Sequence, residues 1–332
     1  MEKNKKTKSA VRIWVEYILF IGLFQLLEIL PMPLAMFMAS KLFRVLSYLD
    51  IRHRQRTISH IIYSGVETDP AKAKALANVN FEELGKLLVE MAKMKKMYSF
   101  DRFTLTGSEI ARNLVAGTKD DCPQQFIFVT AHYGNWEIAG TAIADINRKK
   151  IVSMMRAFEN PLIGKRVIRQ RTNKNHSLSG KEQGLRPVIQ AFKDGKSLAI
   201  VVDQHAVSNE GVEVEFFGHP ARHHKTPALL HLKTGFPIVP ILIHRINNKF
   251  EFECIHGDPI VHESTGDRDL DVAMITQRVS WQIEDIIRMD PSQWLWAPRH
   301  WLSLDRRCSK DYADWKPRFT REELCGSVAS AN

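Results

Sequence analysis

The 332-residue sequence contains few cysteines, and several motifs of common functional classes are absent from it. The four cysteines lie far apart and form no CxxC pair, so neither a zinc site nor a disulfide framework is predicted. No Gly-x-Ser-x-Gly segment occurs, which argues against a hydrolase built on a serine elbow. A glycine-rich phosphate loop and an aromatic RNA-binding motif are also missing, so no nucleic acid is expected as a partner.

The chain also lacks an uninterrupted apolar stretch of the roughly 20 residues that a membrane-spanning helix needs. Residues 11–30 come nearest, but charged residues such as Arg12 and Glu28 lie near their ends. Lysines precede this stretch as in a signal peptide, yet no small-residue cleavage site follows it. Residues 34–49 form a second, interrupted apolar stretch. This pattern favours an anchor that lies in or along one leaflet, with a plain transmembrane span as the alternative.

Composition is otherwise that of a globular protein, with 44% hydrophobic and 25% charged residues. The formal net charge of +10 predicts an anionic partner, which an anionic membrane or a phosphorylated lipid would supply. We expect three regions: a basic N-terminus with a hydrophobic anchor (1–50), a main domain (51–318) and a loosely held tail (319–332).

Short apolar runs separated by helical patterns predict an α/β fold, a layered sheet with flanking helices after the N-terminal anchoring helix. A long helix is expected over residues 68–97, with Asp69 as its cap and Pro70 in its first turn. The apolar runs are residues 126–130, 151–155, 198–202, 238–243 and 250–255, and the later helical stretches are residues 184–193, 226–233 and 269–289.

One motif joins the first apolar run to the helical pattern after it. His132 follows the run directly and Glu137 comes five positions later, with Gly134 and Asn135 suited to the turn between them. Such a pair can act as a general base and the carboxylate that orients it. The alternative is a histidine satisfied at a strand end and a glutamate in the first turn of a helix. Arg156 and Asp203 follow the next two runs, so we expect them to share a site with His132, since active groups gather beyond the carboxyl ends of such strands.

The segment from His132 to Glu137 resembles the His-x4-Glu/Asp signature of the glycerolipid acyltransferase superfamily. Its residues are most similar to those of the lipid A biosynthesis acyltransferase branch. Further matches occur in the family's order, and the resemblance extends over residues 18–301. These matches are Arg156 with Asn160 and Pro161, residues 169–174, residues 203–205, residues 216–218, residues 237–240 and residues 293–300.

This resemblance implies an acyltransferase at the inner membrane, with its catalytic domain facing the cytoplasm. The implied reaction moves a fatty acyl chain from an acyl carrier protein thioester to a hydroxyl of a lipid A precursor. His132 would be the general base, and Glu137 would hold the tautomer of its ring and stabilise the imidazolium. Beyond these co-substrates no cofactor is expected.

The remaining candidates are predicted to bind substrate. Arg156, Arg169 and Arg171 suit the phosphate or carboxylate of a glycolipid or of the donor's phosphopantetheine, because the planar guanidinium binds such anions bidentately. The family pattern singles out Arg169 and Asp203, and Asp203 is expected to position other groups. Asn135 completes this set.

Two departures from the family pattern leave the acceptor open. Residues 222–226 are rich in basic side chains, and Ala297 with Pro298 interrupts an aromatic and basic run. His219, His223 and His224 have no carboxylate or cysteine at ligand spacing, so no metal is expected. The alternatives are the same chemistry on another glycolipid, phospholipid or aminolipid, a coenzyme A donor, or a non-catalytic scaffold at the membrane surface.

Overall fold

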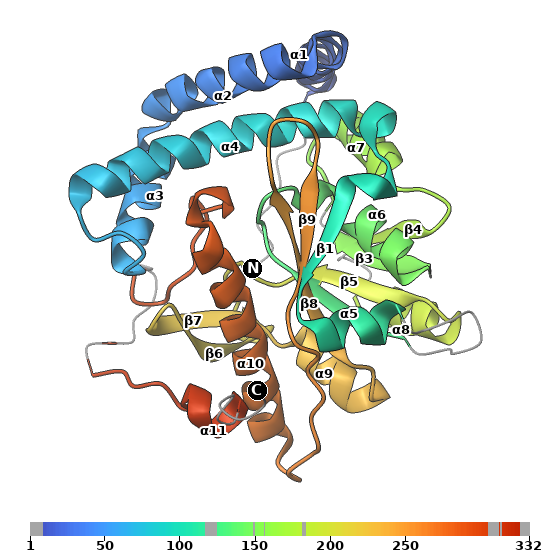
Figure 1. Cartoon of the computed structure of the whole chain (residues 1–332), viewed down its shortest axis with the longest axis vertical. Helices are drawn as coiled ribbons and strands as arrows, with labels where there is room; N and C mark the ends of the chain where they lie inside the picture. The colour runs from blue at the N-terminus through green and yellow to red at the C-terminus, as the bar shows by residue number, and fades with distance from the viewer. Residues whose placement is uncertain are drawn as a thin grey trace.

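The structure is a computed structural model that describes residues 9–116, 125–148, 150–155, 157–180, 184–304, 312 and 314–325. It confirms the predicted α/β class, with a central sheet between helices and an apolar N-terminal helix (Figure 1). The helices before the sheet are α1 (Ala10–Ile29), α2 (Met32–Leu49), α3 (Ile51–Tyr63) and α4 (Pro70–Met97). The later helices are α5 (Glu109–Ala116), α6 (Trp136–Asn147), α7 (Pro161–Arg171), α8 (Arg186–Lys193), α9 (Thr226–Thr234), α10 (Arg268–Met289) and α11 (Arg321–Cys325).

The main sheet has the strand order β1-β9-β8-β2-β5-β3-β4. Its neighbouring strands run parallel except β8 and β9, which are antiparallel. A separate antiparallel hairpin is formed by β6 and β7. The strands are β1 (Phe103–Gly107), β2 (Ile127–Thr130), β3 (Ile151–Met155), β4 (His176–Gly180), β5 (Ser197–Val201), β6 (Gly211–Phe216), β7 (His219–His224), β8 (Ile238–Arg245) and β9 (Phe252–His256).

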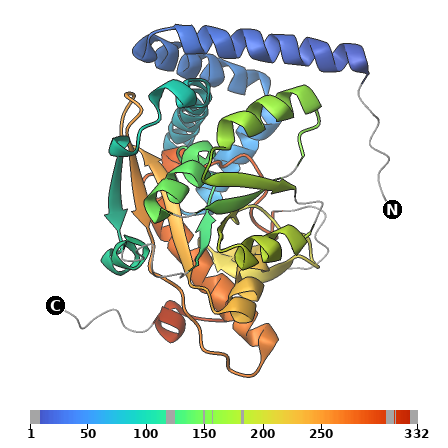
Figure 2. The same ribbon diagram turned by 90° about the vertical axis from the view of Figure 1, so that its right-hand side faces the viewer.

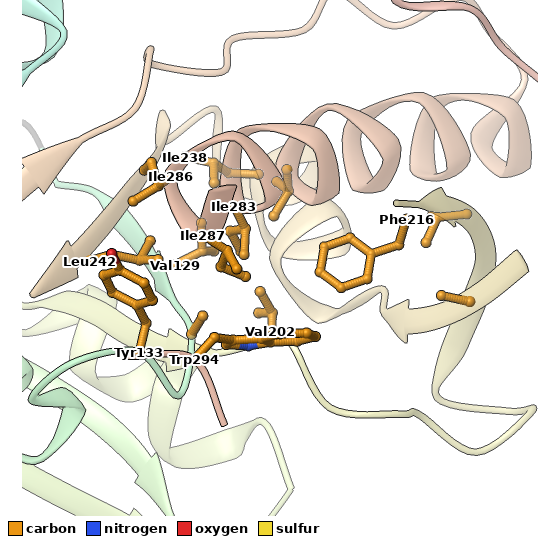
Figure 3. Packing of buried hydrophobic residues seen from close by; sticks show 14 of the residues in the cluster. Val129, Tyr133, Val202, Phe216, Ile238, Leu242, Ile283, Ile286, Ile287 and Trp294 are labelled. Atoms are coloured by element: carbon orange, nitrogen blue, oxygen red, sulfur yellow. The ribbon is translucent and has the colours of Figure 1, made fainter. Parts of the chain in front are cut away.

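Strand β2 lies at the centre of the sheet and is buried along its whole length, which explains its continuous apolar sequence. Val129 packs on the side of α10, against residues such as Ile283 and Ile287 (Figure 3). Phe128 points to the opposite face, where it joins a cluster with Ile143 of α6. Both faces of the sheet are therefore covered, and the polar groups that end β2 emerge from a rigid support.

The N-terminal helices form a layer over α4, on the side of the molecule where α7 also lies (Figures 1 and 2). Lys93 of α4 donates to the carbonyl oxygens of Glu28 and Leu30 at 3.0 and 2.6 Å and so caps the end of α1. Near the other end of α1, the Asn160 amide donates to the carbonyl oxygen of Ile13 at 2.9 Å. Helix α1 is long and apolar enough to cross a membrane, but these bonds hold it along the domain.

Asp69 caps α4 as predicted, since its carboxylate accepts from the amides of Ala71 and Lys72. In the segment expected to be a loose tail, α11 is held to α10 by an ion pair of Arg321 with Asp285 at 2.7 Å.

Candidate active site

The turn that follows β2 carries His132, and Gly134 and Asn135 determine its shape. Gly134 has φ of +53°, and a Cβ atom there would lie 1.9 Å from the Ile243 carbonyl oxygen, so only glycine fits. The amides of Gly134 and Asn135 donate to the carbonyls of Gln293 and Ile243, both at 3.0 Å. Backbone bonds to two other segments thus fix the path of the chain on both sides of the turn.

His132 is held by Asp203, which follows β5. Its Nδ1 lies 2.8 Å from Asp203 Oδ1, and its backbone N–H donates to Asp203 Oδ2 at 2.9 Å. Trp294 Nε1 donates to the same Oδ2 at 2.8 Å. Since a carboxylate only accepts, Nδ1 carries the proton, and Nε2 is left with a lone pair.

The electrostatics of the pair favour the ionised carboxylate. Burial raises the pKa of Asp203. The positive charge of His132 and the hydrogen bond from its ring outweigh the effect of burial, so the pKa of Asp203 lies well below its usual value. Burial likewise lowers the pKa of His132, and the charge and hydrogen bond of Asp203 reverse this, so the net pKa is raised. His132 therefore binds a proton more readily than an ordinary histidine does.

The prediction that Glu137 holds the His132 ring is wrong. Glu137 lies in the first turn of α6 and accepts two hydrogen bonds from Arg171, from Nε at 2.5 Å and from Nη2 at 2.6 Å. Trp136 Nε1 donates to it as well, at 3.0 Å. The carboxylate is thus engaged by a bidentate guanidinium, while Asp203 occupies the orienting position at the ring.

A cavity of about 400 Å³ opens in front of these groups, between the sheet edge, α6 and the segment before α7. Its polar lining includes His132, Glu137, Arg171 and Gln204, whose Nε2 lies 3.4 Å from His132 Nε2. Apolar side chains form much of the remaining wall. They include Ile143, Met154, Met155, Phe158, Leu178 and Ile200.

The other predicted site residues fall in three different places. Arg171 lines the cavity, whereas Arg169 is exposed on α7 and is not among the lining residues, so the cavity supports the prediction for Arg171, and that for Arg169 stays a prediction. Arg169 and Arg171 lie two positions apart, which turns their side chains to different sides of the helix. Arg156 lies outside the described residues.

Asn135 is a structural residue, which corrects its assignment to substrate binding. Its side chain is 1% exposed, accepts from the Ile138 amide as the cap of α6, and donates to Glu90 Oε2 at 3.0 Å. Glu90 in turn accepts from Arg245 Nε at 2.5 Å and Nη2 at 2.7 Å. A buried ion pair between α4 and β8 thus supports the turn that carries His132.

Trp294 was not predicted as a site residue, although it lies in one of the segments that resemble the family. Gln204 was missed in the same way, because an amide side chain beside an aspartate gives no distinct signal in one sequence. His300, whose Nδ1 lies 3.2 Å from the Asp203 carbonyl oxygen, is a third. Burial lowers the pKa of His300 to about 3, so this ring is neutral and adds no charge behind Asp203.

Within the described part of the chain, no group of three or more histidine, cysteine, aspartate or glutamate side chains is arranged to hold a metal ion. Of the three clustered histidines, His223 hydrogen-bonds to Ser280 and His219 stacks on Tyr63.

The cavity offers an imidazole base, a guanidinium and an apolar wall. These groups suit proton transfer from a ligand that is part polar and part apolar.

Comparison with known proteins agrees with this chemistry. A family model described as "Bacterial lipid A biosynthesis acyltransferase" matches residues 1–303. A protein of Mycobacterium tuberculosis (strain ATCC 25618 / H37Rv) called phosphatidylinositol mannoside acyltransferase is 23% identical over 180 residues. That of strain CDC 1551 / Oshkosh has the same identity and length of match. Each match covers 53% of this chain and 54% of the relative, so the chain spans about half the length of these curated relatives.

Proposed function

The chain belongs to the bacterial lipid A biosynthesis acyltransferase family, and from this premise we propose that it is a membrane-associated O-acyltransferase. It transfers a fatty acyl chain from an acyl carrier protein thioester to a hydroxyl of a lipid A precursor. The observation that carries the proposal is the His132 ring, held by a buried carboxylate with its Nε2 lone pair toward a partly apolar cavity.

His132 acts as the general base. Its Nε2 accepts the proton of the acceptor hydroxyl while that oxygen bonds to the thioester carbonyl carbon. Asp203 keeps the ring in the required tautomer and stabilises the imidazolium that forms. The carbon–sulfur bond then breaks, and the thiolate leaves with the proton from the imidazolium. The protein supplies no nucleophile in this scheme.

Arg171 binds the anionic part of a substrate, and Glu137 holds its guanidinium at the cavity wall. A bidentate pair suits this task because the fork is fixed in one plane. Arg156 stays a prediction for the same role, since its neighbour Met155 lines the cavity.

The N-terminal helices attach the enzyme to the cytoplasmic side of the inner membrane. Large apolar side chains of α1 and α2 point outward, with Leu19 69% and Phe37 61% exposed. Because α1 is bonded along the domain, embedding of this face in one leaflet is the favoured arrangement. The full chain should stay with membranes in high salt and leave them in detergent, whereas release by salt alone would show a merely electrostatic attachment.

A second candidate keeps this chemistry and changes the acceptor to another glycolipid, with acyl carrier protein or coenzyme A as the carrier. The name of the mycobacterial relatives, phosphatidylinositol mannoside acyltransferase, supports this alternative. A non-catalytic scaffold is disfavoured, because it would not explain why the buried Asp203 carboxylate raises the pKa of His132 at the cavity.

The test is an assay of the full chain in detergent with acyl carrier protein and coenzyme A thioesters and extracted lipids, with products identified by mass. His132→Ala should lower acyl transfer about 100- to 10,000-fold. His53→Ala is the matched control, since His53 is an exposed residue of α3. Near-normal transfer by His132→Ala in a folded protein would refute the mechanism.

A further inference from the structure

Ser153 and His176 line the same cavity as His132, from strands β3 and β4. Ser153 Oγ lies 2.9 Å from His176 Nε2, and His176 Nδ1 lies 2.6 Å from the Arg171 carbonyl oxygen. The mechanism above uses neither side chain. Their arrangement nevertheless determines which hydrogen bonds this part of the cavity can make with a ligand.

The direction of each bond follows from its partners. A carbonyl oxygen only accepts, so His176 Nδ1 carries the proton in the bond to Arg171. Burial lowers the pKa of His176, which keeps the ring neutral and leaves Nε2 with a lone pair. Ser153 must therefore donate its only proton to His176. What Ser153 Oγ presents to the cavity is a pair of acceptor sites and no donor.

The His176 ring is fixed in this position. It is 3% exposed and packs on α6, where a Cβ atom at Gly140 would lie 2.2 Å from His176 Cε1. Because Gly140 leaves room for the ring and Arg171 anchors its Nδ1, the ring cannot turn to offer Ser153 a donor instead.

Ser153 also lies deeper along the sheet, further from the strand ends, than the turn that carries His132. It pairs with Ala199 and Leu178, whereas Thr130 at the end of β2 pairs with Val201, two residues further along β5. Two residues of strand correspond to roughly 7 Å. The two strand partners of Ser153 that also line the cavity, Leu178 and Ala199, are apolar. A half-buried acceptor between apolar side chains favours a ligand that brings one neutral donor.

We propose that Ser153, with its proton bound by His176, is a hydrogen-bond-accepting subsite that selects acyl donors carrying an alcohol O–H or amide N–H at this depth. The proposal rests on the proposed function, because it takes the ligand to be an acyl thioester. Two parts of such a molecule supply this chemistry, a hydroxyl on the acyl chain or an amide of the pantetheine arm.

The experiment measures equilibrium binding of three probes to the full chain in detergent by calorimetry, with no acceptor lipid. The probes are dodecanoyl-pantetheine, 3-hydroxydodecanoyl-pantetheine, and dodecanoyl-pantetheine with both amide nitrogens methylated. The wild type should prefer the donor-bearing member of one pair about three- to tenfold, the usual range for one net hydrogen bond. The pair that shows this preference identifies the source of the donor.

Ser153→Ala should abolish that preference, and Ser153→Thr, which keeps the hydroxyl, should restore it. Ser177→Ala is the matched control, because Ser177 is an exposed serine of β4 whose hydroxyl donates to the Ile151 carbonyl oxygen. A purely structural role of Ser153 would weaken all three probes equally and leave their ratio unchanged.

Three results would overturn the subsite: no preference in either pair, equal weakening of every probe by Ser153→Ala, or no binding of any probe by the wild type. An acyl adduct found on Ser153 by mass would also overturn it, since the hydroxyl would then be a nucleophile. Because binding is read without turnover, intact discrimination without any acyl transfer refutes the proposed function alone. Transfer without discrimination refutes the subsite alone.

Discussion

Two carboxylates border the candidate active site, and they are built differently. Asp203 follows a strand, is fully buried, and accepts from an imidazole ring, a backbone amide and an indole. Glu137 begins a helix and meets the fixed positive charge of Arg171. A carboxylate beside an ionisable ring changes the basicity of that ring, whereas a carboxylate beside an arginine mainly fixes where the arginine lies.

This difference assigns separate tasks to the sheet and to the helices. In the proposed mechanism the sheet edge carries the proton-transfer pair, because the strand ends hold His132 and Asp203 within hydrogen-bonding distance. Helices α6 and α7 carry the ion pair of Glu137 with Arg171, which lines the cavity. Substitutions on the sheet side should therefore lower the rate of reaction, and those on the helix side should weaken use of substrate.

The largest effect is expected for Asp203→Asn. The asparagine amide can donate to His132 Nδ1 and so stabilise the tautomer in which Nε2 is protonated and cannot accept. We expect kcat to fall about 100- to 10,000-fold with little change in KM. Steady-state kinetics and the thermal midpoint of unfolding would be measured together, and a variant with near-normal kcat would remove Asp203 from the mechanism.

The pH dependence should separate the same two carboxylates. Only the neutral His132 ring can accept a proton, and its pKa is raised, so kcat/KM should rise with pH through a value above that of an ordinary histidine. Asp203→Asn removes the two largest interactions that raise this pKa, and it leaves burial, which lowers the pKa, opposed by the weaker effect of the Glu137 charge. The rising limb of the variant should shift to lower pH, while that of Glu137→Gln should shift less. Equal shifts in both variants would contradict the division of tasks.

Glu137→Gln should have a smaller effect on turnover. Arg171 would lose its bidentate partner and its fixed orientation, so we expect KM for the anionic substrate to rise about tenfold, as for a lost charged hydrogen bond. Arg171→Lys should show a similar rise, since an ammonium lacks the planar fork. If kcat of Glu137→Gln fell as far as that of Asp203→Asn, Glu137 would take part in the proton-transfer step after all.

Arg169→Ala should have the smallest effect, within about twofold on kcat and KM, as for an exposed charge away from the ligand. The matched comparison is Arg171→Ala, two positions further along α7. If Arg169→Ala changed kcat or KM more than Arg171→Ala did on every anionic lipid, the proposed anion-binding role of Arg171 would be wrong.

The sequence predicted the central strands because buried parallel strands have continuous apolar runs, as β2 does. It missed β1 and β4, which are the edge strands of the sheet and are only partly buried. The approximate place of the site was predictable, since polar residues followed strand ends. Which carboxylate meets His132 was not, because Asp203 is 71 residues away and sequence spacing favoured the nearer Glu137.

The bond from Trp294 to Asp203 can form only late in synthesis of the chain. The two residues are 91 positions apart, and Asp203 is itself 71 positions beyond His132. At about 5–20 residues per second of synthesis, about 8 to 32 seconds separate the emergence of His132 from that of Trp294. Helices α1 and α2 precede all three residues, so the apolar anchor can reach the bilayer while the acid–base pair is still unassembled. Under the proposed function, attachment to the membrane can therefore precede completion of the site.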